Sequence, residues 1–472
     1  MNLMSAIIGS LLLLAALPSF AAGPVRVSAS DEQTGMEVTV YNNNLGLIKD
    51  TRKMDLPKGE GELRFMDVAS QIMPYTVRVK SVNSPEAFTV LEQNYEYDLI
   101  NAAKLLDKYV GKGIKIIDWN KFQDRKETVD ATLLSNNQGP IYKIKDEIYL
   151  GHPGIQVLPG LPENLVAKPT LTWLYESAAA AIHNLEVSYL TQNINWKADY
   201  VMIVNKDDTA ADLSGWVSLD NQSGATYTDA RLKLVAGEVH RVGLELERPM
   251  AAAEAPKRAK TEQFQEKAFF EYHIYDLQRK TTLKDKQTKQ VSLLQADSAK
   301  IRKELVIYGA QTYFTRLYRE NIPKQPVNVY IQLKNSKENG LGMPLPAGVV
   351  RVYKRDDDDS QQFIGEDRVL HTPKDEELKL KMGEAFDVVA ERVQKDYKQL
   401  TRTLHESEWE VTIRNHKDRE ITVAVVEPIP GNWEMVRSSH PFKKVDAFTI
   451  RFEVKVPKDV EDKINYRVKV GL

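Results

Sequence analysis

Five times in this chain, a stretch of alternating apolar and polar residues ends in an asparagine that a short polar run follows. These asparagines are Asn42, Asn205, Asn221, Asn335 and Asn415. Alternation with a period of two places one side of a β-strand against a core. Asparagine tolerates left-handed backbone angles and can bond to its own turn, so each instance predicts a strand followed by a turn. The recurrence along the chain predicts a mainly β protein.

The clearest alternation lies near the C-terminus. Phe448, Ile450, Phe452, Val454 and Val456 fall on one side of a predicted strand, and mostly polar residues stand between them. Similar short runs recur at spacings of about ten residues with polar turns between them, which is typical of β-sandwiches. We therefore expect tandem, immunoglobulin-like β-sandwich domains over most of the chain.

The first 21 residues have the composition of a signal peptide. Residues 1–22 contain no charged side chain, and an apolar run ends at Pro18. Small residues, Ser19 and Ala21, occupy the two positions that a signal peptidase reads, so we expect cleavage after Ala21. An uncleaved anchor is the alternative, but the apolar run is shorter than the ~20 residues of a membrane span. We expect a periplasmic or secreted protein with no transmembrane segment after cleavage.

Cysteine usage and charge exclude several classes of function. The 472 residues include no cysteine, which excludes disulfides, thiolate nucleophiles and cysteine-ligated metals. Export without cysteine points to a bacterial envelope, since a chain of this length can bury a core without disulfides. The 64 basic and 66 acidic residues give a net charge of −2. This balance gives no reason to expect a nucleic-acid partner.

Changes in composition divide the mature chain into four expected domains. Residues 22–96 read as a small all-β domain and residues 97–165 as a helix with a small barrel. Residues 166–325 read as a β-sandwich, and residues 326–472 as a C-terminal immunoglobulin-like sandwich. Residues 245–262, which are poor in bulky apolar side chains, predict a mobile loop within the third domain.

A single helix is expected near residue 100. Asp98 is suited to cap it, apolar residues from Leu99 to Val110 follow at helical spacing, and Gly111 ends it. Several short strands between residues 114 and 150 come next. One helix followed by such strands fits a barrel of the SH3 type.

The sequence contains no familiar catalytic motif. We find no G-x-S-x-G, S-x-x-K, H-E-x-x-H, Walker A or G-x-G-x-x-G pattern. No two of the eight histidines stand three or four residues apart, so no helical metal pair is predicted. We therefore assign no catalytic residue and expect no cofactor.

Two segments offer candidate binding residues, each with a structural alternative. Tyr272, His273 and Tyr275 belong to an aromatic strand that could line a sugar site; the favoured interpretation is a packed strand with Phe270, Tyr272 and Ile274 inward. The second segment is a run of four aspartates whose oxygens could hold calcium, although strands flank it and a solvated hairpin tip is favoured. Its members are Asp356, Asp357, Asp358 and Asp359.

Paired carboxylates are a third possibility, because folding can bring any two acids together. Glu92 and Glu96 flank Asn94 and Tyr95 and are the candidates for such a pair. The favoured interpretation is that they are polar residues between a strand and the helix.

Several phrases together resemble a known family. They include residues 92–99, residues 196–200, residues 234–239 and residues 364–367, together with the closing Glu427-Pro428-Ile429-Pro430. The chain resembles bacterial exported proteins of the domain of unknown function 4139 family, a domain that also occurs in mucoidy-inhibitor-A-like proteins. The resemblance implies an all-β exported protein and supplies no catalytic residues. Such mucoidy-inhibitor-A-like relatives carry a coiled coil before this region, and this chain has no long heptad run.

Three functions follow as hypotheses. The first is a non-catalytic envelope protein that binds an envelope protein or glycan through its sandwich faces or loops. The second is an envelope hydrolase with a carboxylate-based site, which predicts a cleft holding acids of perturbed pKa. The third is an assembly role through strand addition at an exposed sheet edge. Fold alone does not decide among them, since sandwiches host many functions.

Overall fold

A computed structural model describes the chain in eight ranges, which are 23–97, 99–120, 124–152, 154–162, 166–237, 239, 264–318 and 322–472. The predicted signal peptide, the predicted cap Asp98 and the predicted loop at 245–262 lie outside them. The described residues form thirty-two strands and one α-helix, which confirms the mainly β prediction. None of the helical segments in these ranges has the length and apolar character of a membrane span.

The described residues fold as two compact units. The first draws on residues 23–37 and on the described residues within 47–192 and 223–225, and the second on residues 38–46 and 193–222 and the described residues within 226–472. The long strands β2 (Gln33–Tyr41) and β3 (Leu45–Leu56) give residues to both. The four expected domains divide the chain more finely than these units, and their boundaries stay predictions.

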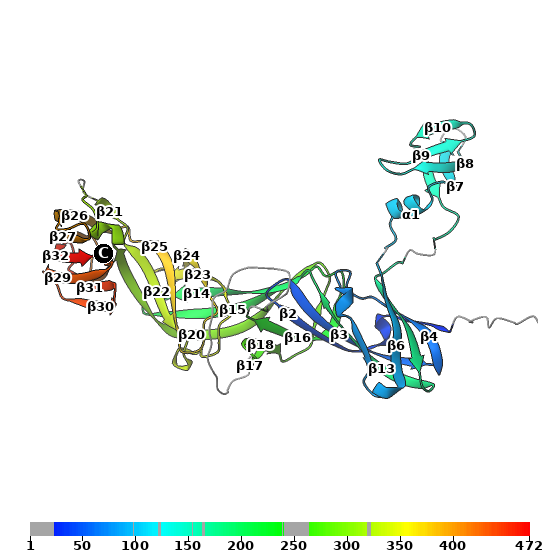
Figure 1. The fold of residues 1–472 in the computed structure, drawn as a ribbon, viewed down its shortest axis with the longest axis horizontal. Helices are drawn as coiled ribbons and strands as arrows, with labels where there is room; N and C mark the ends of the chain where they lie inside the picture. Colours follow the sequence, from blue (N-terminus) through cyan, green and yellow to red (C-terminus); the bar gives the residue numbers. More distant parts are fainter. Residues whose placement is uncertain are drawn as a thin grey trace, which may run out of the picture. The chain divides into compact units, whose positions relative to one another are not determined.

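A four-stranded sheet in the first unit has the order β1-β4-β12-β6, and Figure 1 labels two of its strands, β4 and β6. Its strands are Val25–Ser28 (β1), Gly59–Met66 (β4), Thr170–Ser177 (β12) and Phe88–Glu96 (β6). Phe65 and Trp173 point to its buried side and meet edge to face, with ring centroids 5.8 Å apart. Two further strands of this unit, β5 (Arg78–Ser81) and β13 (Ala181–Thr191), pair antiparallel.

Residues 99–162 hold the helix and a five-stranded sheet, which we call the α1–β11 module. Its strands are Gly113–Asn120 (β7), Arg125–Ser135 (β8), Ile141–Ile144 (β9), Glu147–Leu150 (β10) and Ile155–Val157 (β11). The sheet order is β10-β9-β8-β7-β11, so β10 and β11 are its two edges. The described strands do not close, and the predicted SH3-like barrel is therefore wrong in this respect. A small core that includes Ile116, Leu133 and Tyr142 covers one side of the sheet.

The helix is shorter than the sequence pattern predicts. It runs from Ala102 to Lys108 (α1), and Asn101 caps it by accepting the N–H of Lys104 at 2.9 Å. The apolar residues from Leu99 to Val110 have helical spacing, but the turn at Tyr109 ends the helix before Gly111. A cap three residues later than predicted explains the lost first turn.

The second unit is built from two large sheets and a smaller group of strands. The larger sheet has the order β24-β23-β14-β15-β20-β28-β31-β30, with β22 paired to β20 and to β25. Its strands are Ile194–Val204 (β14), Ala210–Asn221 (β15), Gln287–Tyr308 (β20), Asn328–Lys334 (β22), Gly348–Arg355 (β23), Gln361–Val369 (β24), Glu377–Glu384 (β25), Ile421–Pro428 (β28), Phe442–Asp446 (β30) and Thr449–Val456 (β31). The smaller group is Tyr227–Ala236 (β16), Phe264–Phe269 (β17), Tyr272–Leu277 (β18) and Thr281–Leu283 (β19). Three of these strands belong to an eight-stranded sheet of order β17-β18-β16-β2-β3-β13-β5, and β19 pairs with β16.

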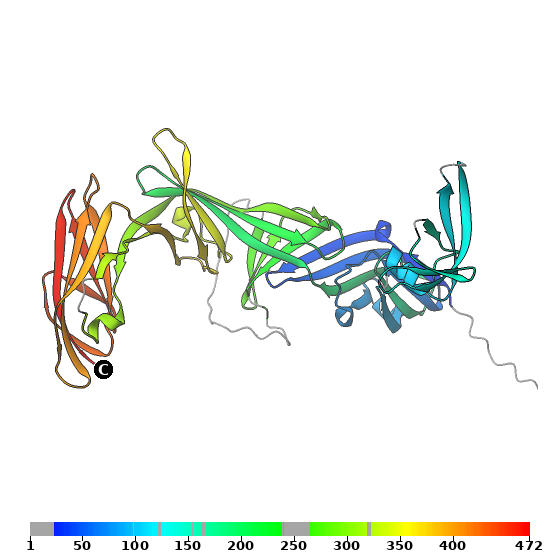
Figure 2. The same cartoon turned by 90° about the horizontal axis from the view of Figure 1, so that it is seen from above.

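The C-terminal sandwich packs part of the larger sheet against a second sheet of order β21-β26-β27-β32-β29 (Figure 2). The strands of the second sheet are Ile322–Gln325 (β21), Val388–Gln399 (β26), Leu404–Asn415 (β27), Asn432–Ser438 (β29) and Glu461–Gly471 (β32). Ile450 and Phe452 lie in the shared core, as their alternation predicts, and Trp409 and Ile413 of the second sheet pack there with them. Phe448 precedes β31 and is exposed, so it does not extend that buried row.

The asparagines that end the strands act through their side chains. Asn335 donates to the carbonyls of Met343 and Pro373 and accepts the N–H of Gly342, at 2.8, 2.9 and 3.1 Å. Asn415 and Asn205 bond to their own turns in a similar way. None of the five asparagines has a positive φ angle. The predicted turns are confirmed, but the left-handed backbone invoked to explain them is wrong.

Candidate functional site

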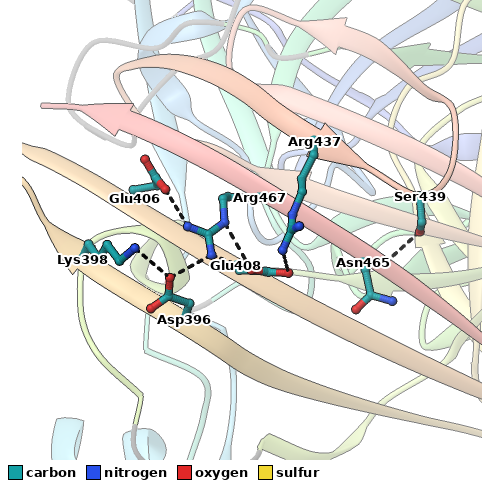
Figure 3. Close-up of polar contacts among 8 residues, drawn as sticks. All are labelled: Asp396, Lys398, Glu406, Glu408, Arg437, Ser439, Asn465 and Arg467. Carbon is teal, nitrogen blue, oxygen red and sulfur yellow. Dashed lines mark hydrogen bonds and ion pairs between the residues drawn. The ribbon is translucent and has the colours of Figure 1, made fainter.

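A ladder of charged side chains covers the outer face of the sheet that contains β26, β27, β29 and β32 (Figure 3). Alternation along β27 sends Trp409 into the core and Glu406 and Glu408 outward. The same alternation along β32 sends Tyr466 inward and Arg467 outward. Neighbouring strands therefore place acids beside bases on the polar face.

Arg467 is the centre of this charge ladder. Its guanidinium donates to Glu406 at 2.7 Å, to Glu408 at 2.6 Å and to Asp396 at 2.8 Å. Glu408 also accepts from Arg437 (Figure 3). Partial burial alone would raise the pKa of Glu408, but Arg467 and Arg437 hold that pKa below its ordinary value. Glu408 is therefore fixed as a paired anion and is unsuited to donate a proton at neutral pH.

The opposite, buried side of the same sheet holds a second ion pair. Nη1 of Arg392 donates to Oε1 of Glu427 at 2.6 Å and to the hydroxyl of Tyr466 at 3.0 Å, and neither charged side chain is exposed. Burial lowers the pKa of Arg392, but the adjacent Glu427 carboxylate outweighs it and raises that pKa above its ordinary value. The Arg392 guanidinium therefore stays charged inside the sandwich.

Two polar atoms of this buried pair have no hydrogen-bond partner in the described residues. They are Nη2 of Arg392 and Oε2 of Glu427. Oε2 fits only because residue 309 is a glycine: a Cβ on Gly309 would overlap it. A buried ion pair with unsatisfied atoms costs free energy, so these residues are unlike the apolar core around them.

One buried acid, Asp50, and one buried histidine, His183, have shifted pKa values of the kind that catalytic groups often show. Burial raises the pKa of Asp50, as a general acid requires, but Asp50 is 4% exposed and bonds to Arg52 at 2.7 Å. His183 contacts the hydroxyls of Ser177 and Ser81 at 3.3 and 3.0 Å, and burial lowers its pKa. Neither group is open to a substrate, because the residues around them exclude solvent.

The aromatic strand predicted as a candidate binding site is β18. Tyr275 is fully buried, its hydroxyl donates to the carbonyl of Pro344 at 3.0 Å, and its ring meets Trp196 edge to face. His273 contacts Oε1 of Glu266 at 2.8 Å, and Tyr272 is half-buried beside it. The structure brings Tyr272 and His273 near the surface but encloses Tyr275.

The predicted inward set of this strand is partly wrong. Ile274 is buried, but Phe270 is exposed, since it lies in the turn between β17 and β18 with φ of 56°. The turn reverses the chain, so the alternation of β18 does not extend back to Phe270.

The four aspartates lie at the tip of the hairpin between β23 and β24. Asp356 donates its N–H to the carbonyl of Ser360, and Asp359 donates to the carbonyl of Asp356. Lys206 binds the tip through Asp357 and Asp359. Within the described ranges, no three or more acids and histidines are grouped as metal ligands would be.

Glu92 and Glu96 lie on β6 itself. The sequence analysis expected them between a strand and the helix, and the strand is longer than expected. Oε1 of Glu96 accepts from the hydroxyl of Thr172 at 3.2 Å, and Glu92, four residues earlier on the same strand, is exposed. Nothing in this arrangement separates these two acids from other polar residues on an edge strand.

Exposed aliphatic side chains gather at both edges of the sheet in the α1–β11 module. Ile148 and Leu150 on β10 are 65% and 86% exposed, and Ile155 on β11 is 71% exposed. Val157 and Leu161 extend the edge formed by β11. The sequence predicted β10 but not β11, and it predicted the exposure of neither, because an edge strand is recognised only once its pairing is known.

The family match covers most of the second unit and part of the first. The profile of the domain of unknown function DUF4139 matches residues 185–470. The chain belongs to this family. The match includes the C-terminal sandwich, with its charge ladder and its buried Arg392–Glu427 pair. The α1–β11 module lies before the matched range. No curated protein matches the chain.

Proposed function

We propose that this DUF4139 protein is an exported, non-catalytic protein of the bacterial envelope that binds another protein through the α1–β11 module. The observation that supports the proposal is the exposure of Ile148, Leu150 and Ile155 at sheet edges that pair with no other described strand. Exposed apolar clusters are uncommon on monomeric proteins and mark interaction sites. Burying one such side chain contributes about 1.5–3 kcal/mol.

The chemistry of these residues favours a protein partner over a glycan. Ile148, Leu150, Ile155 and Val157 are aliphatic, and such side chains gain free energy by contacting other apolar groups. A free sheet edge also offers unpaired backbone N–H and C=O groups, which an extended peptide can satisfy. Aliphatic contacts combined with backbone bonds suit a polypeptide.

Two observations support a non-catalytic role. The acid Glu408 is paired with arginines that keep it ionised, and the acid with a raised pKa, Asp50, is enclosed. General acid catalysis needs a proton donor that a substrate can reach. Export and bacterial origin rest on the signal-peptide pattern and on the absence of cysteine in the sequence.

The test is site-specific photo-crosslinking in bacterial envelope extracts. A photoreactive amino acid is placed at Ile155, and the matched control carries it at Lys463, an exposed residue of β32 in the C-terminal sandwich. We expect a discrete protein adduct from position 155 and none from position 463. The adduct should disappear when Val157 and Leu161 are replaced by lysine.

An adduct that forms equally from both positions, or from neither, would contradict the proposal. Release of envelope fragments by the purified protein would contradict its non-catalytic part. Circular dichroism of each variant checks that the fold is intact.

A further inference from the structure

We propose that strand β10 pairs antiparallel with β10 of a second copy of this chain, joining the two α1–β11 sheets into one. The inference rests on the proposed binding role of the module and commits one of its two edges to self-association. It leaves the β11 edge to the other protein.

Strand β10 has the features of an edge that is ready to pair. It bonds to β9 on one side only, with Ile148 opposite Lys143 and Leu150 opposite Ile141. All four residues of the strand are exposed. Ile148 and Leu150 project from one face of the sheet and Tyr149 from the other, since side chains alternate along a strand.

A two-fold axis perpendicular to the sheet limits the possible registers. Residues directly opposite each other in an antiparallel pair lie on the same face, so one residue must face its own copy. An axis at Glu147 would place two glutamates together, which is destabilising. An axis at Ile148 would leave Leu150 opposite no residue of β10, and an axis at Leu150 would leave Ile148 opposite none, because the strand runs only from Glu147 to Leu150.

The remaining register, with the axis at Tyr149, matches like with like. Ile148 faces Leu150 of the second copy, and this pair occurs twice on one face. The two Tyr149 side chains meet on the other face. Every apolar residue of β10 then gains an apolar neighbour, which is the pairing that stabilises adjacent strands.

The charge on β10 does not oppose the same register. Glu147 is the one charged residue of the strand, and in this register it does not face Glu147 of the second copy. Oε2 of Glu147 accepts the hydroxyl of Tyr149 on its own strand at 2.9 Å. No like charges of β10 face each other, so the charges that commonly guard an edge do not block this pairing.

The contact is short, which sets the concentration at which it must be sought. Four residues in each copy bury far less than the ~1,200 Å² of a standard stable interface. We therefore expect a weak dimer, visible by sedimentation at about 100 μM protein and dissociated at about 1 μM.

Cysteine scanning reads the register directly, because the chain has no thiol of its own. Under mild oxidation, Tyr149→Cys should give a disulfide-linked dimer, since facing Cα atoms lie about 4.5–5.5 Å apart. Ile148→Cys should give little dimer, because its two copies would be about 8 Å apart. A dimer from Ile148→Cys but not from Tyr149→Cys would overturn the proposed register.

Lysine substitutions test the edge itself. Replacing both Ile148 and Leu150 by lysine should weaken the dimer by about tenfold or more, because lysines on an edge oppose pairing. Replacing Ile155 and Val157 by lysine is the matched control, with equal charge on the other edge of the same sheet, and should leave the dimer unchanged.

The outcomes separate this inference from the proposed function. A monomer at about 100 μM, with no disulfide from Tyr149→Cys, overturns self-pairing; adducts at Ile155 would still uphold binding of another protein. A dimer that the β11 control weakens as much as the β10 variant also overturns the inference, since the contact would not lie at β10.

Discussion

Two five-stranded sheets in this protein differ in the kind of side chain that they expose to solvent. In the C-terminal sandwich, the outward side chains of the sheet are charged and bonded to one another, with Arg467 joining three acids. In the α1–β11 module, exposed positions at the sheet edges are aliphatic, as at Ile148 and Leu150. Sheets with equal strand number and similar alternation thus have, in one case, a polar face whose charges are paired with one another and, in the other, edges with exposed apolar side chains.

The two sheets also differ in what lies beneath them. The sandwich sheet covers a large core and still accommodates the buried pair of Arg392 and Glu427. The module has a core of few residues, which includes Leu133 and Tyr142. A large core can offset a costly buried charge, whereas a small one depends on each apolar side chain.

The largest effect is expected from Glu427→Gln in the sandwich. The change leaves the buried Arg392 without a counter-charge, so we expect the free energy of unfolding of the sandwich to fall by about 3–5 kcal/mol. Hydrogen exchange of β26 and β27 amides under increasing denaturant measures this loss. Glu453→Gln, on the solvent side of β31, is the control.

Removing both charges sharpens the same comparison. The double variant Arg392→Met, Glu427→Leu should lose less of the free energy of unfolding than Glu427→Gln does, because no unpaired charge remains. A double variant that is less stable than the single variant would contradict the idea that the unpaired charge is the cost.

A smaller effect is expected in the module, from Leu133→Ala. Leu133 is fully buried in the small core, so we expect a loss of about 3 kcal/mol. The loss should appear as faster hydrogen exchange in β7, β8 and β9, with the sandwich unchanged. Leu134→Ala, at the adjacent and partly exposed residue, should change stability by less than about 0.5 kcal/mol. Equal effects from both variants would mean that the core described here does not hold the module together.

The smallest effect is expected from Glu408→Gln in the charge ladder. A solvent-facing ion pair contributes about 1 kcal/mol or less, and salt screens it. The pKa of Glu408 is lowered in the folded state, so its contribution is present above about pH 4.5 and is lost as the pH falls through the lowered value. Denaturation at low and high salt, at pH 7 and pH 3, measures it, with Glu434→Gln as the control. A loss that persists at high salt would show that Glu408 acts through packing.

Sequence patterns predict well where one strand is sufficient to decide the outcome. Alternation placed Ile450, Phe452 and Val454 in the core, and all three are fully buried. The asparagines were correctly placed at turns, although the bonds from Asn335 reach residues that only the folded chain brings near.

Patterns fail where the outcome depends on a second strand. Arg392 occupies an inward position in the row Val388, Ala390, Arg392. A charged residue ordinarily faces solvent, so the pattern alone does not predict this position. Its counter-charge Glu427 lies on a different sheet. The strand at Ile148 was predicted as well, but whether it lies inside a sheet or at its edge depends on pairing. That pairing is a property of the whole module.

The position of Asn335 affects how the protein responds to deamidation. Its amide nitrogen faces carbonyl oxygens and its oxygen faces an N–H, in a site with no exposure to solvent. Spontaneous hydrolysis of that amide to a carboxylate would replace a donor with a negative charge directed at the same carbonyl oxygens, which is strongly unfavourable in a buried site. Chains that undergo this change before folding would lack the means to close the turn after β22. For this one residue, rapid folding is also chemical protection.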